Sequence, residues 1–208
     1  IANFDFYPDA YVRMKLVFAT QNSNKIKEVR SLLPSSIQLI SLRDLETGEE
    51  LPETGRTLEA NASQKARYIY DKFGLNCFAD DTGLEVEALG GRPGVWSARY
   101  AGPACRTEDN IRKVLTELKD VTNRAARFRT VIALIGDGEV YLYEGIVNGR
   151  ISLEPSGTGG FGYDPVFIPD QESRTFAEMS LEEKNRISHR GMAIQAFISG
   201  LTTIVKER

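Results

Sequence analysis

The chain has 208 residues, of which 41% are hydrophobic and 26% are charged, a composition typical of a globular protein with a sizeable core. Its length suits one domain or two closely packed lobes. A net charge of −3 provides no basic surface for the phosphates of a nucleic acid, and no apolar run reaches membrane-spanning length, so we expect neither a nucleic acid nor a membrane as partner.

The few cysteines and histidines restrict the metal chemistry and the compartment. Cys77 and Cys105 form neither a disulfide framework nor a metal-binding spacing, and His189 is the only histidine, which argues against zinc bound by imidazoles. Nothing in the sequence resembles a signal peptide. We therefore expect a cytoplasmic protein.

The N-terminal residues look detached from the rest of the chain. Met14 is followed at once by a short apolar run, 15–19, which predicts a buried strand, as if the native protein began there. We expect residues 1–13 to be a non-native or upstream extension and residues 14–208 to form a single domain.

A polar segment joins this strand to the first predicted helix, whose apolar residues recur at helical spacing between 26 and 33 and which ends at Pro34. Backbone N–H groups at a helix N-terminus bind phosphate, so the segment predicts a phosphate site to which Lys25 adds a mobile charge. Plain helix capping by Asn22 or Asn24 is the alternative. The segment consists of Thr20, Gln21, Asn22, Ser23, Asn24 and Lys25.

A second strand, 37–41, precedes a longer helix over 58–73. Apolar residues line one face of this helix, and Gly74 is a plausible C-terminal stop. Three polar residues fall off the apolar stripe. We expect a solvated helix face for them, with a position facing a cleft as the alternative; they are Glu59, Asn61 and Lys65.

Asp80 and Asp81 follow an apolar run, at what the pattern indicates is the end of a strand. Two adjacent carboxylates repel one another unless a cation compensates them. Their hard oxygen atoms favour magnesium over zinc. A turn shaped by Asp and Gly is the alternative explanation.

The middle of the chain predicts a mixed sheet. Residues 90–100 combine Gly and Pro with aromatic and cationic residues, which indicates an ordered loop at a subunit contact or over the cleft. A helix follows, with apolar residues between 111 and 118. The extended runs 126–135 and 139–149, joined by a tight turn at 136–138, predict an antiparallel pair.

A glycine-rich segment, 157–165, superficially matches a dinucleotide fingerprint but leads into an extended run rather than a helix, so we reject that match. Phe161 or Tyr163 is placed to stack on a base, with Asp164 beside it. A mobile loop is the alternative, and the aromatic content argues against it.

Two helices are predicted near the C-terminus. Ser180 and Glu183 form a capping box, and a second helix opens at Ser188. The donors Lys184, His189 and Arg190 lie within a short span and suit polyphosphate and base oxygens. A basic surface cluster is the alternative, and is favoured for this span alone.

Five of these motifs occur together and in order: 20–25, 79–84, 93–100, 157–167 and 184–190. Together they closely resemble the inosine/xanthosine triphosphate pyrophosphatase family, over almost the whole chain. The resemblance implies a homodimer of two-lobed α/β subunits, each with a long mixed β-sheet flanked by helices and an active cleft between the lobes. It also implies magnesium-dependent hydrolysis of deaminated purine nucleoside triphosphates (ITP, dITP, XTP) to the monophosphate and pyrophosphate.

The resemblance also assigns roles to residues. The phosphate-binding loop is 20–25, and Thr82 is a substrate contact. The resemblance assigns magnesium binding to Glu53 and Asp81, with Asp80 in support. Glu59 is close enough to Glu53 in the sequence to compete for the role of Glu53. Asp81 is also the expected general base. The base and ribose pocket consists of Phe161, Gly162, Tyr163, Asp164, Lys184, His189 and Arg190.

A 6-oxo purine presents an acceptor where adenine presents a donor. Donors from His189 or Arg190 would form hydrogen bonds with the oxo group. The amino group of adenine would leave these donors without an acceptor, and a buried donor without a partner costs binding free energy. Two other functions compete with this one. They are a pyrophosphatase for modified pyrimidine nucleotides and a nucleotide-binding module that does not hydrolyse.

Overall fold

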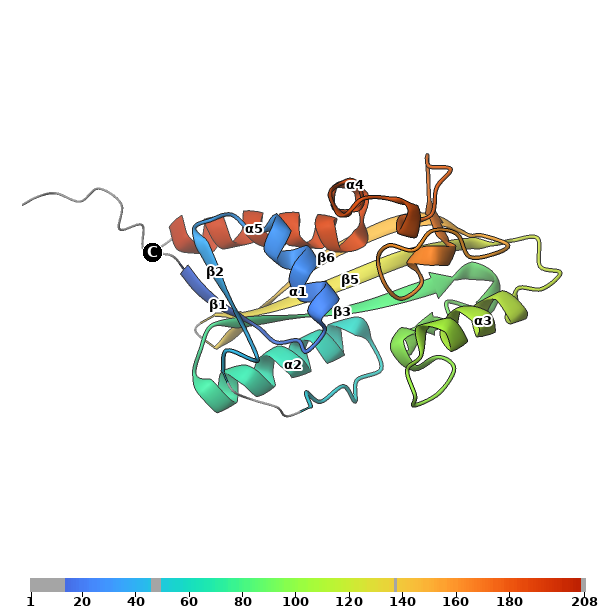
Figure 1. The fold of residues 1–208 in the computed structure, drawn as a ribbon. Coiled ribbons are helices and arrows are strands. Elements are labelled where there is room, and N and C mark those ends of the chain that lie inside the picture. Colours follow the sequence, from blue (N-terminus) through green and yellow to red (C-terminus); the bar gives the residue numbers. More distant parts are fainter. Residues whose placement is uncertain (1–13, 46–49, 137, 207–208) are drawn as a thin grey trace, which may run out of the picture.

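The computed structural model describes residues 14–45, 50–136 and 138–206. The predicted extension, residues 1–13, therefore lies outside the described residues, as does residue 137 of the predicted turn. The described part is an elongated α/β molecule built along one long sheet (Figure 1). No helix in this part is long and apolar enough to cross a bilayer.

The sheet has the order β2-β1-β3-β5-β6-β7, with β4 paired to β3. The first three strands on this path are parallel, whereas the others pair antiparallel, so the mixed sheet is confirmed. The strands are β1 (Met14–Phe18), β2 (Ile37–Ser41), β3 (Cys77–Val86), β4 (Pro93–Gly94), β5 (Ala125–Gly136), β6 (Glu139–Ile151) and β7 (Phe167–Pro169).

Helices cover both faces of the sheet (Figure 1). The helix α5 packs on β5 and β6 with α1 beside it, and α2 packs on the opposite face against β3 and β5. The α-helices are α1 (Ser23–Leu32), α2 (Leu58–Phe73), α3 (Thr107–Glu117), α4 (Leu181–Ile187) and α5 (His189–Lys206). Short 3₁₀ helices are η1 (Glu87–Leu89), η2 (Ser97–Arg99), η3 (Asp164–Val166) and η4 (Phe176–Glu178).

Strand β3 separates two hydrophobic cores by the alternation of its side chains. Cys77 and Ala79 pack with residues of α2, whereas Phe78 packs with Phe18 and Phe197 on the side of α5. The same alternation continues beyond Ala79, so successive polar residues of β3 also face opposite sides of the sheet.

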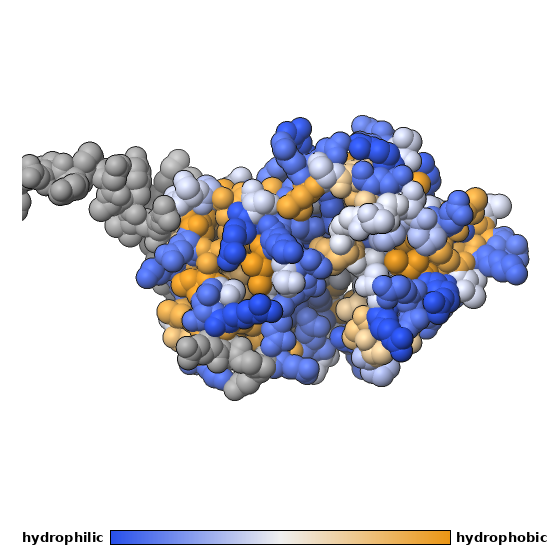
Figure 2. Space-filling view, in the orientation of Figure 1, coloured by the Kyte–Doolittle hydropathy of each residue, from blue (hydrophilic) through white to orange (hydrophobic). Residues whose placement is uncertain are grey.

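A second lobe is built on the far half of the long strands. Its core joins Leu84 and Phe128 of β3 and β5 to residues of α3, β7 and η4. The two lobes therefore share the strands β3, β5 and β6 and differ in the helices that cover them. Figure 2 shows a hollow between the two halves of the molecule, and the cleft described below lies between these lobes.

Candidate active site

A cleft of about 760 Å³ opens between the lobes and gathers most of the residues predicted from the sequence. It is bordered by the N-terminal end of α1, by α2, by the loop before η2 and by the start of α5. Ser23 and Asp80 are the predicted residues that do not line it. Those that do are Thr20, Gln21, Asn22, Asn24, Lys25, Glu53, Asp81, Thr82, Phe161, Gly162, Tyr163, Asp164, Lys184, His189 and Arg190.

The capping interpretation of the segment 20–25 is confirmed. The Asn22 side chain caps α1, since its Oδ1 accepts from the backbone N–H groups of Asn24 at 3.0 Å and Lys25 at 3.2 Å. The segment also borders the cleft, with the N-terminal end of α1 beside it. Lys25 reaches across to β3, where its Nζ lies 2.9 Å from Asp80 Oδ1.

Asp80 is enclosed by cations. Its Oδ1 pairs with Lys25, its Oδ2 accepts from Arg190 Nε at 3.1 Å, and only 1% of the residue is exposed. Burial by itself would raise the pKa of this carboxyl, but Lys25 and Arg190 hold that pKa far below its usual range. Asp80 is therefore a carboxylate that fixes two cations.

Asp81 lies on the other face of β3, beside α2. Its Oδ2 accepts from Asn61 Nδ2 at 3.0 Å, and its Oδ1 accepts from the backbone N–H of Thr82 at 3.0 Å. Burial raises the pKa of Asp81, with the nearby lysines Lys65 and Lys25 opposing the shift. A buried carboxylate with a raised pKa at a cleft is suited to accept a proton.

Lys65 joins Asp81 to Glu53. Its Nζ lies 2.6 Å from Glu53 Oε1 and 3.7 Å from Asp81 Oδ1. Arg99, from the other lobe, approaches the same glutamate, with Nη1 3.6 Å from Glu53 Oε2. Glu59 instead pairs with Arg129 and does not line the cleft, so Glu53 is the glutamate beside Asp81.

The prediction of a solvated face for Asn61 and Lys65 is wrong. They are 1% and 4% exposed, and both side chains point at the carboxylates of the cleft. Asn61 also fixes the loop that carries Glu53, because its Oδ1 accepts from the backbone N–H of Gly55 at 2.8 Å. Polar residues off an apolar stripe here face a site rather than water.

A second set of residues that line the cleft is aromatic and cationic. Lys184 Nζ lies 4.9 Å from the centre of the Phe161 ring, and the Arg190 guanidinium lies 5.5 Å from it. Asp164 Oδ2 accepts from Lys184 Nζ at 2.6 Å and from the Phe161 backbone N–H at 2.8 Å. Tyr163 is buried, and its hydroxyl donates to the Ser97 carbonyl at 2.9 Å.

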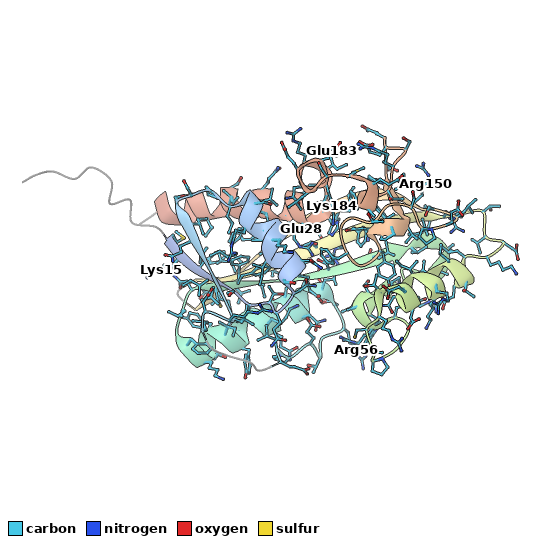
Figure 3. The ribbon with its side chains drawn as sticks, viewed as in Figure 1. Lys15, Glu28, Arg56, Arg150, Glu183 and Lys184 are labelled. Carbon is cyan, nitrogen blue, oxygen red and sulfur yellow. The ribbon has the colours of Figure 1, made fainter. Side chains whose placement is uncertain are left out.

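Lys184, His189 and Arg190 are buried, which excludes the surface cluster that the span alone favoured. Glu28 of α1, a residue that the sequence does not indicate, compensates the buried charges of Lys184 and Arg190. Glu28 Oε1 lies 2.7 Å from Lys184 Nζ, and Oε2 pairs with Arg190 Nη1. Figure 3 shows Glu28 and Lys184 pointing toward one another from α1 and α4.

His189 also lines the cleft and is buried. It stacks on Phe128, with ring centroids 4.5 Å apart, and its Nδ1 has no hydrogen-bond partner among the described residues. Burial, reinforced by the positive charge of Arg190, lowers the pKa of this imidazole well below its usual value. The ring is therefore neutral at physiological pH, with one nitrogen as donor and one as acceptor.

The donor chemistry of the cleft fits a hard divalent cation. The described residues contain no group of three or more acidic, Cys or His side chains placed to hold a metal. Magnesium at nucleotide sites, however, is typically held by one or two carboxylates together with phosphate oxygens of the substrate. Asp81 and Glu53 supply such a pair, whereas both oxygens of Asp80 are already occupied by cations.

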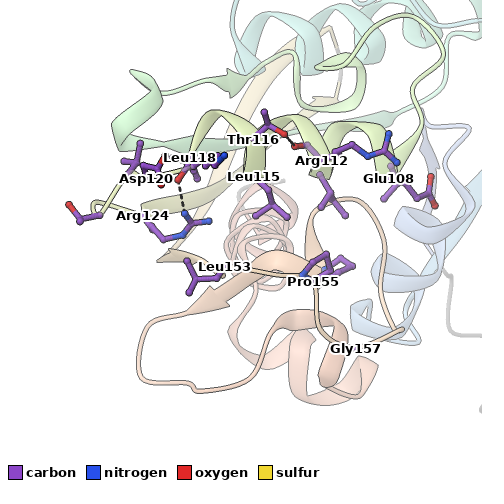
Figure 4. Close-up of a pocket in the computed structure, with 16 residues that line it drawn as sticks. Glu108, Arg112, Leu115, Thr116, Leu118, Asp120, Arg124, Leu153, Pro155 and Gly157 are labelled. Carbon is purple, nitrogen blue, oxygen red and sulfur yellow. Dashed lines mark hydrogen bonds between the residues drawn. The ribbon is translucent and has the colours of Figure 1, made fainter.

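A second groove, of about 1170 Å³, lies along α3 and has a different set of lining residues. Figure 4 shows Leu115 facing Leu153 and Pro155 across it, and Arg124 donating to the Leu118 carbonyl. Its acidic residues Glu108 and Asp120 lie at opposite ends (Figure 4). The carboxylates that suit catalysis are therefore in the cleft between the lobes.

Comparison with known proteins agrees with the motifs. A model of the Ham1 family matches residues 16–200. The dITP/XTP pyrophosphatase of Flavobacterium johnsoniae is 52% identical over 189 residues, covering 91% of this chain and 98% of that protein. That of Porphyromonas gingivalis is 50% identical over 86% of this chain and 93% of its own length.

Solved structures agree as well. The Ham1 protein of Coxiella burnetii matches with a TM-score of 0.83 and 39% identity, over 94% of this chain and 100% of that one. The Ham1 protein of Staphylococcus aureus matches with a TM-score of 0.81 and 40% identity, over 89% and 98%. The resemblance predicted from the motifs is thereby confirmed, and the chain belongs to the Ham1 family.

Proposed function

We propose that the protein hydrolyses deaminated purine nucleoside triphosphates (ITP, dITP and XTP) to the monophosphate and pyrophosphate. The observation that carries this proposal is that one cleft brings together two sets of residues. The first set is Asp81 and Glu53 with Lys65, and the second is the aromatic, donor-rich set of Phe161, His189 and Arg190. The relatives named dITP/XTP pyrophosphatase support the substrate class.

The triphosphate is held by cations that the fold fixes in advance. Lys25 lies at the N-terminal end of α1, where the helix dipole favours an anion. Lys65 and Lys184 border the same cleft from α2 and α4. Asp80 positions Lys25, and Glu28 and Asp164 position Lys184, so these two lysines need little reorganisation when the phosphates bind.

Asp81 acts as the general base. Its carboxylate takes a proton from the water that attacks the α-phosphorus, and pyrophosphate leaves. The raised pKa of Asp81, caused by burial, brings the carboxylate nearer to the strength that this proton transfer needs. Asn61 holds the carboxylate in place through the 3.0 Å hydrogen bond to Oδ2.

Magnesium is the proposed cofactor, held by Asp81 and Glu53 with phosphate oxygens of the substrate. When bound, it offsets the negative charge that grows on the leaving pyrophosphate. We assign Asp80 a supporting role, because it holds Lys25 and Arg190 in place from the other face of β3.

We assign selection of the base to the aromatic, donor-rich residues of the cleft. Phe161 provides a ring on which a purine can stack, and His189 and Arg190 provide donors for a 6-oxo group. Adenine would place its amino group against these donors and leave them unpaired, which is costly in a buried pocket.

The test is pyrophosphate release from ITP, XTP, GTP, ATP and modified pyrimidine nucleoside triphosphates, with magnesium and with excess chelator. Release from ITP and XTP that the chelator abolishes is the expected result. Orthophosphate in place of pyrophosphate would move the attack to the γ-phosphorus. Binding of ITP without any release would favour the nucleotide-binding module, and release from modified pyrimidine nucleotides alone would favour the other pyrophosphatase.

We further propose a homodimer in the cytoplasm, as the family resemblance implies. The α3 lobe and the loop 90–100 present exposed apolar side chains, among them Trp96 and Leu153. Sedimentation equilibrium at micromolar concentration tests the dimer. A mass of one chain, 23.2 kDa, at every concentration would contradict it.

A further inference from the structure

Lys65 holds the two carboxylates that suit the metal. Its Nζ is 2.6 Å from Glu53 Oε1 and 3.7 Å from Asp81 Oδ1, and the residue is almost fully buried. Burial alone would lower the pKa of this lysine, but Asp81 and Glu53 raise it above its usual value. Without a bound cation, the ammonium is therefore a positive charge held between two negative ones.

A divalent cation and this ammonium need the same oxygen atoms. Two cations a few ångströms apart in a partly buried site repel strongly, so they cannot both keep Glu53 and Asp81 as close partners. Asp80 offers Lys65 no replacement, because its oxygens already pair with Lys25 and Arg190. The four-carbon stem of lysine allows the ammonium to move while α2 stays in place.

We propose that Lys65 competes with the divalent cation for Glu53 and Asp81, and that its ammonium passes to the substrate's phosphates when the metal binds. This inference rests on the proposed function, which supplies the metal and the triphosphate. Metal bound without nucleotide leaves a buried ammonium without a full set of partners. The nucleotide therefore strengthens metal binding, and the metal strengthens nucleotide binding by the same factor.

The test measures metal binding alone, with no nucleotide and no turnover. Mn²⁺ binding is followed by electron paramagnetic resonance and Mg²⁺ binding by calorimetry, for the wild type and Lys65→Met. We expect Lys65→Met to bind either metal about tenfold more tightly or better, the order expected when a unit charge at this distance is removed. Lys65→Arg keeps the charge and is expected to bind the metal as weakly as the wild type.

Lys72→Met is the matched control. It removes a lysine from the exposed last turn of the same helix, where Lys72 lies over the Tyr68 and Phe73 rings. Its metal affinity is expected to equal that of the wild type. Metal binding by Lys65→Met that is equal to or weaker than wild-type binding would overturn the inference.

A second measurement on the wild type keeps the inference testable if Lys65→Met does not fold. Lysines labelled with ¹³C at Cε give one signal for Lys65, identified by its loss in Lys65→Arg. That signal is expected to shift as Mg²⁺ is added. A signal that stays fixed while the metal binds would contradict the displacement. An enzyme that cleaves ITP with an unmoved signal refutes only this inference, whereas a moving signal without cleavage refutes only the proposed function.

Discussion

Asp80 and Asp81 are consecutive residues of β3, yet their carboxylates lie on opposite faces of the sheet and meet different partners. Side chains alternate along a strand, so Asp80 points to Lys25 and Arg190 while Asp81 points to α2. The pKa of Asp80 is lowered because its cations outweigh burial, and the pKa of Asp81 is raised because burial outweighs its cations. One residue is suited to hold charges in place and the other to take up a proton.

The first prediction separates these roles by replacing each aspartate with Asn. Asp80→Asn leaves Lys25 and Arg190 without their buried counter-charge and is expected to lower the free energy of unfolding by about 3–5 kcal/mol. Asp81→Asn removes a carboxylate that burial disfavours, so it is expected to lower stability less. It should, however, reduce kcat by about 10²–10⁴ through loss of the base.

Urea denaturation and pyrophosphate release from ITP, measured on both variants, check this prediction. Each variant serves as the control for the other, because the two positions are adjacent and the chemical change is the same. A larger stability loss in Asp81→Asn than in Asp80→Asn, or near-normal turnover of Asp81→Asn, would contradict the assignment.

The sequence predicts the regular elements better than it predicts which polar residues face the site. The strand over 37–41 and the helix over 58–73 with Gly74 at its end are confirmed residue for residue, because hydrophobic spacing and a left-handed glycine mark them. Periodicity marks only the apolar stripe of a helix, so it predicts a solvated face for Asn61 and Lys65 and gives no sign that they face a cleft. A polar residue that faces a cleft has the same sequence pattern as one that faces solvent.

Glu28 and the role of Asp80 illustrate a second limit. Glu28 binds Lys184 and Arg190, which are 156 and 162 residues away along the chain, and no local pattern indicates such a contact. The adjacency of Asp80 and Asp81 predicts a cation shared by two repelling carboxylates, but the alternation of side chains along a strand places the two carboxylates on opposite faces. Because β3 continues through both residues, the two carboxylates are separated and their repulsion is small.

The second prediction concerns the only histidine. An unfolded histidine titrates near pH 6.5, whereas burial keeps the pKa of His189 well below that value in the folded protein. Below pH 6.5 the unfolded chain therefore binds the additional proton, and folding stability falls as the pH decreases, by up to about 1.4 kcal/mol per pH unit. The contribution of His189 is complete above pH 6.5 and is lost as the pH falls toward its folded pKa.

Urea denaturation at pH 7.5, 6.5 and 5.5 measures this slope, and His189→Gln is expected to flatten it. Glu28 and Asp80, whose pKa values are lowered, contribute in the same direction but begin only near the ordinary range of carboxyl groups, about pH 4. The single imidazole signal in an NMR titration provides an independent check. A signal that titrates near pH 6.5 in the folded protein would refute a buried neutral ring.

The third prediction concerns Gly145 of β6, on which the start of α5 lies. A Cβ at this position would come within 2.1 Å of the His189 carbonyl oxygen and 2.4 Å of the Ala193 backbone nitrogen. Gly145→Ala must therefore push the first turn of α5, with His189 and Arg190, away from the sheet. We expect a stability loss of about 1–3 kcal/mol and a raised KM for ITP.

Gly136→Ala is the matched control for this change. Gly136 lies at the end of β5, and a Cβ there would meet no atom within 4 Å. Its stability is expected to change by less than about 1 kcal/mol, with an unchanged KM. Equal KM values for the wild type and Gly145→Ala would show that the position of α5 does not control the substrate pocket.

The fourth prediction concerns Arg99, which crosses the cleft from one lobe to the other. Its Nη2 donates to the Glu53 carbonyl at 3.3 Å, its Nη1 lies 3.6 Å from Glu53 Oε2, and its guanidinium lies 4.6 Å from the centre of the Trp96 ring. Two positions are expected for the loop 90–100, a subunit contact or the cleft, and Arg99 lines the cleft together with Val95, Ser97 and Ala98. Arg99 thereby holds the backbone and the carboxylate of Glu53 from the opposite side.

Arg99→Ala is expected to raise the KM for ITP and the magnesium concentration at half-maximal activity, because Glu53 loses one of its two cationic partners. Both groups are partly exposed, so the stability change should stay below about 1 kcal/mol. Arg92→Ala, in the same loop, is the control, since Arg92 contacts Glu117 and the Leu89 carbonyl and not Glu53. Equal magnesium requirements for the wild type, Arg99→Ala and Arg92→Ala would mean that the contact across the cleft does not position Glu53. A shift in Arg99→Ala alone would mean that this contact across the cleft positions Glu53.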